Sequence, residues 1–175
     1  MKYFWIYVDG NYVAPVPKDW YGKLDARTLQ GKHAYEIPKH LIFLTERHMQ
    51  MVFTDVITFP CFMVSKTVRD VLLQYAPALK FARIVLYSKE RKRSMAYYLP
   101  FLKQEQSVKL AKGAGGTDIF MEREKLSGKV ILETKGMDRT YVMVRMDVLE
   151  SMLRRGAAGI GLREIHIVES GKWPL

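Results

Sequence analysis

The alternation of apolar and polar positions is clearest in residues 139–169, where it predicts a strand, a helix and a second strand. Residues 140–146 alternate with the period of two that is typical of a strand with one covered face. Residues 162–168 alternate in the same way. Between them, an apolar stripe with helical spacing is formed by Val148, Leu149, Met152 and Leu153.

The ends of this helix carry recognisable signals. We expect Asp147 to be the N-cap and Glu150 to return a hydrogen bond to the Asp147 amide, as in a capping box. Gly156 is expected to end the helix, because a left-handed residue is least costly at glycine. The glycines at 156, 159 and 161 follow a helix and precede a strand, which is the reverse of a dinucleotide-binding fingerprint. They indicate a tight helix-to-strand connection instead.

A second strand–helix–strand unit is predicted in residues 61–87. Residues 62–64 are extended in pattern, and Ser65 is a favourable N-cap. Helical spacing then continues to Tyr75, and Pro77 stops the helix.

Three further segments complete the middle of the chain. Residues 81–87 and 95–102 flank a basic turn at 88–94, which predicts a hairpin. Residues 103–125 lose periodicity and contain several glycines, so we expect a loop. Residues 129–133 are expected to form a strand that pairs with residues 140–146.

The first third of the chain has weaker patterns. Residues 3–8 predict a strand, the Asp9–Gly10 turn follows, and residues 12–16 are expected to return as its partner in an edge hairpin. Residues 18–58 lack periodicity, apart from a short helix predicted near residues 40–50.

Together these elements predict an α+β fold, with a mixed, mainly antiparallel sheet, few helices and two strand–helix–strand units. We expect residues 1–58 to be a hairpin and irregular segment packed on the main domain, which spans residues 59–175.

Composition indicates a globular protein with a real core. The chain has 175 residues, 49% of them hydrophobic, and no apolar run near the roughly 20 residues of a membrane span. The first residues are too short and aromatic for a signal peptide and are interrupted by Asp9. One cysteine allows no internal disulfide. These features predict a cytoplasmic protein without membrane association.

The formal net charge of +10 is concentrated in the middle of the chain, since residues 61–135 contain 15 basic and 7 acidic residues. The excess is densest at residues 89–93 and 103–135. A charge run is usually a solvated turn, and no RNA-binding or helix-turn-helix signature accompanies it. Nucleic-acid binding is therefore an alternative rather than the favoured function.

No catalytic, metal or cofactor site is predicted. Cys61 lies in the apolar sequence FPCFMV, which favours packing over nucleophilic chemistry. The four histidines lack the spacing of zinc ligands, and KGAGGT lacks the end of a phosphate-binding loop. We expect a protein that is not an enzyme, with a hydrolase as the third alternative.

Three segments resemble a known family. VSKTVRDVL at residues 64–72, AYYLP at 96–100 and TYVMVRMDVLESMLRRGAAGIGLREIHI at 140–167 are similar to immunity-protein family eleven of bacterial polymorphic toxin systems, once catalogued as a domain of unknown function. The resemblance covers the chain from about residue 60 onward. It implies a cytoplasmic protein that binds and neutralises a cognate protein toxin, and the family offers no catalytic motif to carry over.

If such a partner is acidic or mixed in charge, the basic middle segment should steer its approach. We expect contacts from Arg91, Lys92 and Arg93 in the basic turn, and from Lys109 and Lys112 in a nearby loop. Aromatic anchors are common in tight interfaces, and by residue type the candidates are Trp20, Tyr97 and Tyr98.

Overall fold

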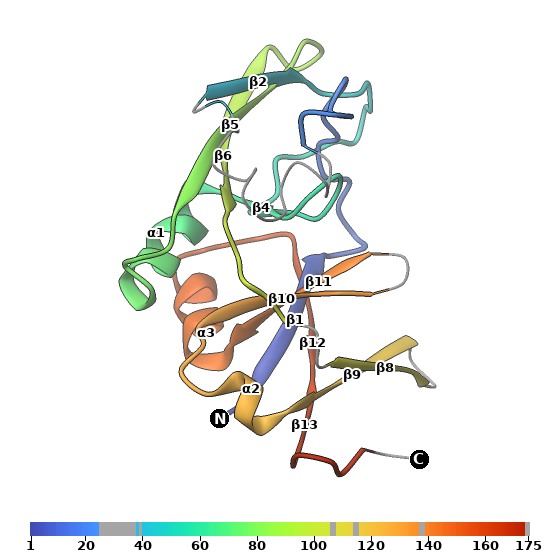
Figure 1. Cartoon of the computed structure of the whole chain (residues 1–175). Coiled ribbons are helices and arrows are strands. Elements are labelled where there is room, and N and C mark those ends of the chain that lie inside the picture. The colour runs from blue at the N-terminus through green and yellow to red at the C-terminus, as the bar shows by residue number, and fades with distance from the viewer. Residues whose placement is uncertain (25–37, 39, 106–107, 114–115, 137–138, 174–175) are drawn as a thin grey trace.

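The computed structural model describes residues 1–24, 38, 40–105, 108–113, 116–136 and 139–173, and the strands of this part of the chain form three sheets (Figure 1). Seven of the ten strand pairs among these residues are antiparallel. Helices are few and short. The predicted α+β fold with mixed, mainly antiparallel sheets is therefore confirmed.

The first five-stranded sheet combines strands from both ends of the chain. In spatial order it contains β12 (Ile160–Glu164), β1 (Tyr3–Val8), β11 (Thr140–Arg145), β10 (Ile131–Lys135) and β7 (Gln104–Glu105). β1 runs antiparallel to both β11 and β12, so it lies inside the sheet. The strand at residues 3–8 is confirmed, but the edge hairpin with residues 12–16 is wrong. Val13 instead forms an isolated bridge with Met51.

The pairing of β10 with β11 confirms the hairpin predicted for residues 129–133 and 140–146. Their register runs from Ile131 opposite Val144 to Lys135 opposite Thr140. The inner strand β11 lies between β1 and β10, which pair with its two edges. From Tyr141 to Val144 it is also buried on both faces, because core side chains cover each face.

The middle sheet has the order β2 (His40–Leu44), β5 (Phe81–Ser88), β6 (Arg93–Pro100), β4 (Met63–Val64) and β3 (Val56–Ile57). β5 and β6 pair along their full length, which confirms the predicted hairpin. The helix predicted near residues 40–50 is wrong, because β2 pairs in parallel with β5. Buried Phe43 alternates with Ile42, which is 73% exposed, as a strand requires.

A small third sheet contains β13 (His166–Val168), β9 (Gly116–Glu122) and β8 (Val108–Gly113). β9 forms an antiparallel hairpin with β8, so the loop predicted for residues 103–125 is wrong in its described part. Ile119 and Met121 are buried while Phe120 and Glu122 are half-buried, which is a period of two that the neighbouring glycines concealed. The short helix α2 (Arg123–Leu126) follows β9.

The starts of the two longer helices, α1 (Lys66–Tyr75) and α3 (Met146–Arg154), differ. Ser65 caps α1 as predicted, since its Oγ accepts a hydrogen bond from the Val68 amide at 3.3 Å. The predicted Asp147 cap of α3 is wrong. Asp147 lies in the first turn, and its carboxylate accepts bonds of 2.7 and 2.9 Å from the Arg145 guanidinium, which lowers the pKa of Asp147. Glu150 pairs with Arg154 at 3.9 Å instead of returning to Asp147.

The end of α3 is as expected, but its buried face is narrower. Gly156 has a φ of 81° and ends the helix in the left-handed conformation. Leu153 is 43% exposed, so its predicted place in the core is wrong. The buried stripe is formed by Val148, Leu149 and Met152.

The strand predicted at residues 162–168 is divided into β12 and β13 at Ile165. The Ile165 amide donates to the Tyr3 carbonyl at 3.1 Å, and its side chain is buried. Because of this break, β12 extends the first sheet and β13 joins the small one.

The two strand–helix–strand units, β4–α1–β5 and β11–α3–β12, are confirmed, and they share one topology. Each pair of strands is parallel, and an antiparallel strand lies between them: β6 in the first unit and β1 in the second. The two helices pack together (Figure 1). Their contact holds the largest core cluster, which includes Val68, Val71, Leu72, Val148, Leu149 and Met152.

Residues 1–58 contribute to both large sheets, β1 to the first and β2 and β3 to the middle one. The strand at residues 3–8 is thus surrounded by strands from beyond residue 139. The division of the chain at residue 58 stays a prediction.

The segment before β3 joins both halves of the fold at Asp55. Its carboxylate accepts hydrogen bonds from the Ser65 hydroxyl at the start of α1 and, at 2.8 Å, from the Ala158 amide after α3. Its own amide and carbonyl bond with the Ala158 carbonyl and the Ser65 amide. At Gly159, with a φ of 72°, a Cβ would lie 2.6 Å from Thr54 Cγ2, so glycine permits this close approach.

Candidate partner-binding surface

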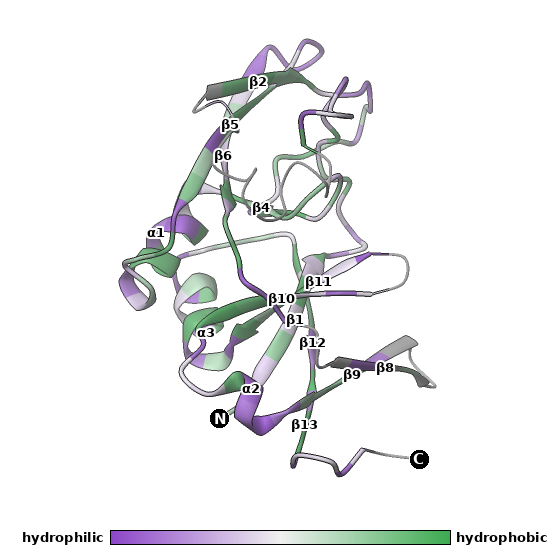
Figure 2. Ribbon diagram, viewed as in Figure 1, coloured by the Kyte–Doolittle hydropathy of each residue, from purple (hydrophilic) through white to green (hydrophobic). Residues whose placement is uncertain are grey.

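The turn between β5 and β6 forms an exposed basic end of the middle sheet. Residues 89–93 carry four cations and one carboxylate, and all five residues are exposed. Lys92 has a φ of 48°, the left-handed conformation that closes the turn. Figure 2 shows this hydrophilic tip at the top of the molecule, beyond the apolar parts of β5 and β6.

Side-chain hydrogen bonds attach the turn to the segment after β2. The Arg91 guanidinium donates to the Met49 carbonyl at 3.2 Å, and Arg47 Nε donates to Glu90 Oε1 at 2.8 Å. Hydrogen bonds from its own backbone amide and from Arg47 lower the pKa of Glu90. Two charged groups of the turn, those of Arg91 and Glu90, therefore attach it to this segment.

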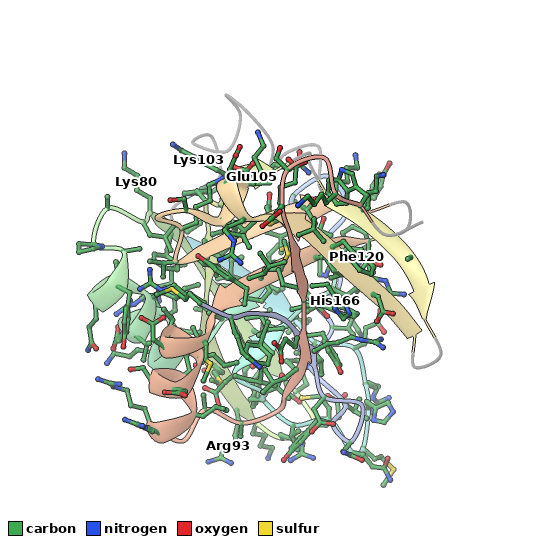
Figure 3. All side chains as sticks on the ribbon, turned by 90° about the horizontal axis from the view of Figure 1, so that it is seen from below. Lys80, Arg93, Lys103, Glu105, Phe120 and His166 are labelled. Carbon is green, nitrogen blue, oxygen red and sulfur yellow. The ribbon has the colours of Figure 1, made fainter. Side chains whose placement is uncertain are left out.

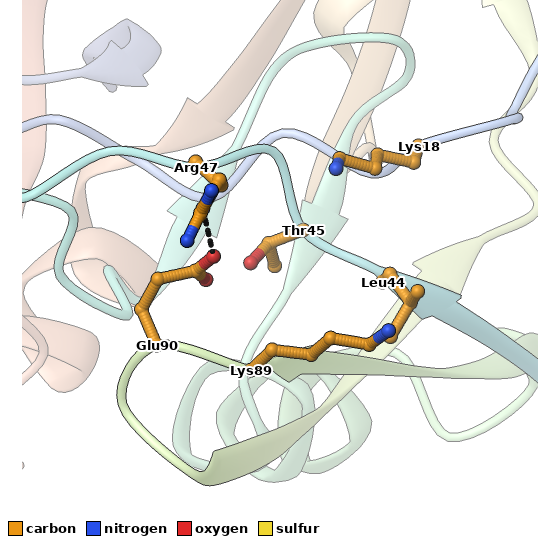
Figure 4. Close-up of a pocket in the computed structure, with 6 residues that line it drawn as sticks. All are labelled: Lys18, Leu44, Thr45, Arg47, Lys89 and Glu90. Carbon is orange, nitrogen blue, oxygen red and sulfur yellow. Dashed lines mark hydrogen bonds and ion pairs between the residues drawn. The ribbon is translucent and has the colours of Figure 1, made fainter.

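A pocket of about 340 Å³ lies beside the turn (Figure 4), lined by Lys18, Leu44, Thr45, Arg47, Lys89 and Glu90. Three cations and one carboxylate give this lining a net charge of +2. The Arg47–Glu90 pair occupies one side, while Lys18 and Lys89 lie on either side of Thr45 in the view of Figure 4.

Thr45 is positioned by backbone hydrogen bonds, and its side-chain hydroxyl has no hydrogen-bond partner in the described structure. Its amide donates to the Tyr87 carbonyl of β5 at 3.0 Å, and it forms an isolated bridge with Pro17. The residue is 4% exposed, and its buried Oγ1 has no hydrogen-bond partner in the described structure. A buried hydroxyl without a partner is costly, so this group is a marked feature of the pocket.

The structure brings together only part of the predicted contact set. Arg91, Lys92 and Arg93 share the β5–β6 turn, but Lys109 and Lys112 lie in β8, at the other end of the molecule (Figure 1). In Figure 3, Arg93 lies at the edge, away from Phe120, the cross-strand partner of Lys109. The prediction that these lysines are near the basic turn is wrong.

Lys109 has a separate local environment, since its Nζ lies 4.8 Å from the centre of the Trp173 ring. Lys112 pairs with Thr117 in the β8–β9 hairpin. The sequence placed these lysines near the turn because the hairpin was not recognised, and a flexible loop could have reached further.

The three predicted aromatic anchors occupy different environments. Tyr97 is fully buried, and its hydroxyl donates to the Thr54 carbonyl at 2.8 Å, so it is a core residue rather than a surface anchor. Tyr98 is half-buried beneath the Arg69 guanidinium, 4.1 Å from its ring centre. Trp20 is half-buried and contacts Tyr21 and Phe59 edge to face.

Sequence reasoning missed the pocket residues Lys18, Thr45 and Arg47. All three lie in residues 18–58, where the sequence predicts no element other than a short helix near residues 40–50. The short apolar run LIFL at residues 41–44 was the available signal, because a run of this length also fits a strand, and a strand at residues 40–44 would have placed Thr45 at its end rather than within a helix.

No group of three His, Cys, Asp or Glu side chains could hold a metal ion in the part of the chain that the structure describes. Cys61 packs against the core of the middle sheet, and burial together with nearby Glu133 raises the pKa of its thiol. This environment agrees with the predicted packing role. Among the described residues, no helix has the length and apolar character of a membrane span.

The segments that carry the family resemblance lie on α1, β6 and the β11–α3–β12 unit, all elements around the central core. Their contributions here are packing, capping and chain reversal, as with Ser65 and Gly156. No protein-family model and no curated protein sequence matches the chain, so membership of the immunity family stays a prediction.

Proposed function

We propose that the protein is an immunity protein, which binds and neutralises a cognate bacterial toxin in the cytoplasm by protein–protein contact rather than by catalysis. The resemblance of residues 64–72, 96–100 and 140–167 to such a family supports this proposal. The observation that carries the choice of surface is the exposed basic turn at residues 89–93, which is held by Arg47 and Met49.

A cluster of exposed cations accelerates the approach of an acidic surface. Anchoring requires large side chains that a partner can cover, and the aromatic cluster of Trp20, Tyr21 and Phe59 offers these. Tyr21 is 69% exposed and Phe59 is 53% exposed. Trp20 is two positions from Lys18, a pocket residue, so this aromatic cluster and the basic turn are the surfaces we assign to the toxin.

The test is co-expression with the product of the neighbouring gene, followed by association rates at two salt concentrations. The Arg91→Glu/Arg93→Glu variant should slow association and weaken protection, and the defect should shrink at high salt. A matched control is Arg123→Glu/Lys125→Glu, which makes the same charge change at exposed positions in α2. This control should retain most of the protection.

Equal loss in both variants would indicate a response to net charge alone and would contradict the proposed interface. A neighbouring product that is harmless without this protein would contradict the immunity function. Binding of DNA or RNA with a steep salt dependence and little partner selectivity would favour the nucleic-acid alternative.

A further inference from the structure

The pocket beside the β5–β6 turn combines positive charge with a buried hydrogen-bond donor that lacks an acceptor. Arg47 is paired with Glu90 at 2.8 Å. Lys18 and Lys89 form no ion pair with any residue that the structure describes. The Thr45 hydroxyl lies in the same pocket and also lacks a partner there.

We propose that this pocket binds an oxyanion, a phosphate or carboxylate group, with Lys18 and Lys89 supplying charge and the Thr45 hydroxyl donating a hydrogen bond. The site goes beyond the proposed toxin binding and needs no toxin for its test. A free small molecule or an acidic side chain of a protein could carry the oxyanion.

The backbone around the pocket is already arranged for such a ligand. The Lys18 amide donates to the Leu44 carbonyl at 2.7 Å, and the Glu46 amide donates to the Val16 carbonyl at 2.8 Å. These bonds fix the two chain segments that carry Lys18 and Thr45. The backbone that carries these side chains is therefore already in place, which lowers the ordering cost of binding.

An oxyanion also resolves two unfavourable features at once. Its negative charge offsets the repulsion between the cations that line the pocket. It also gives the buried hydroxyl an acceptor. Glu90 does not fulfil this role, because its carboxylate is engaged by Arg47 and its hydroxyl contact is with Ser88, at 3.4 Å.

The test titrates the isolated protein with inorganic phosphate and, separately, with glutarate, at constant ionic strength and followed by NMR. We expect saturable shifts at Thr45 and Lys89 with at least one probe. Thr45→Val removes the hydroxyl while keeping the shape, and should weaken binding by about tenfold or more, as for a hydrogen bond to a charged acceptor. Its melting temperature without anion should equal or exceed that of the wild type, which separates lost binding from unfolding.

Two double variants complete the design. Lys18→Gln/Lys89→Gln should abolish saturation, whereas Lys92→Gln/Arg93→Gln removes the same charge from the neighbouring turn and should leave the affinity nearly unchanged. Saturation by phosphate alone would assign the site to phosphate compounds, and saturation by glutarate would assign it to carboxylates. Unsaturable shifts, or equal weakening in both double variants, would show screening of surface charge only and would overturn the site.

Discussion

Asp55→Ala should be among the most destabilising substitutions of a half-buried polar residue in this protein. The carboxylate accepts one hydrogen bond from Ser65 and one from the Ala158 amide, and it connects the start of α1 with the loop after α3. Hydrogen bonds to a charged acceptor contribute about 1.5–3 kcal/mol each, so, with a discount for partial exposure, the loss should be about 2–4 kcal/mol.

A graded series tests this reasoning. Asp55→Asn keeps the shape but replaces one of the two accepting oxygens by an NH2 group and removes the charge, so it should cost about 1 kcal/mol. Glu46→Ala is the control, because Glu46 is an exposed acidic residue near the basic turn.

The assay is urea unfolding followed by circular dichroism, with the free energy of unfolding taken from the midpoint and slope. A loss in Asp55→Ala within about 0.5 kcal/mol of the control would match an ordinary surface substitution. That result would refute the role of Asp55 as a connection between the two helical units.

Three other substitutions address separate parts of the fold. Gly159→Ala should lower the free energy of unfolding by about 2 kcal/mol or more, because a φ of 72° and the lack of space for a Cβ both oppose a side chain. An unchanged midpoint in urea would contradict the close packing there. Met152→Ala should cost about 2–5 kcal/mol and Leu153→Ala clearly less, since Met152 is buried and Leu153 is 43% exposed; equal costs would mean that the buried face of α3 is misplaced. Arg145 lowers the pKa of Asp147 in the folded protein. Their pairing therefore stabilises the fold fully above the ordinary aspartate pKa of about 4, and this stabilisation is lost as the pH falls through the lower pKa of the folded state. Arg145→Gln should therefore reduce stability at neutral pH and flatten the acid limb of the pH profile, and an acid limb as steep as that of the wild type would rule the pair out as its source.

Elements whose signals are local could be predicted from the sequence. α1 has its cap at Ser65 and its stop at Pro77, and the β5–β6 hairpin has two strand patterns around one polar turn. α3 was also found, but its cap was not. The helix begins at Met146 with Arg145 at the N-cap position, so Asp147 lies in the first turn and pairs with the Arg145 guanidinium instead of capping the helix.

Pairings between distant segments could not be predicted in this way. Nothing near residues 3–8 indicates that their neighbours in the sheet begin at Thr140 and Ile160, so the nearest apolar stretch looked like the partner. For the same reason, the pocket could not be predicted from the sequence. Thr45 becomes a buried donor because β2 lies beside β5, and this parallel contact has no turn signal between its strands.

The position of β1 has a consequence for synthesis on the ribosome. β1 is made long before β11 and β12, yet it lies between these two strands in the sheet. Until β11 and β12 have been made, its backbone donors and acceptors lack their final partners, and contacts so distant in sequence are slow to form. A nascent chain that carries an aromatic, β-prone strand without its sheet partners is exposed to aggregation until β11 and β12 have been made. Removal of β1 from the folded protein would leave β11 and β12 with open edges, and it would convert a finished sheet into two surfaces prone to association.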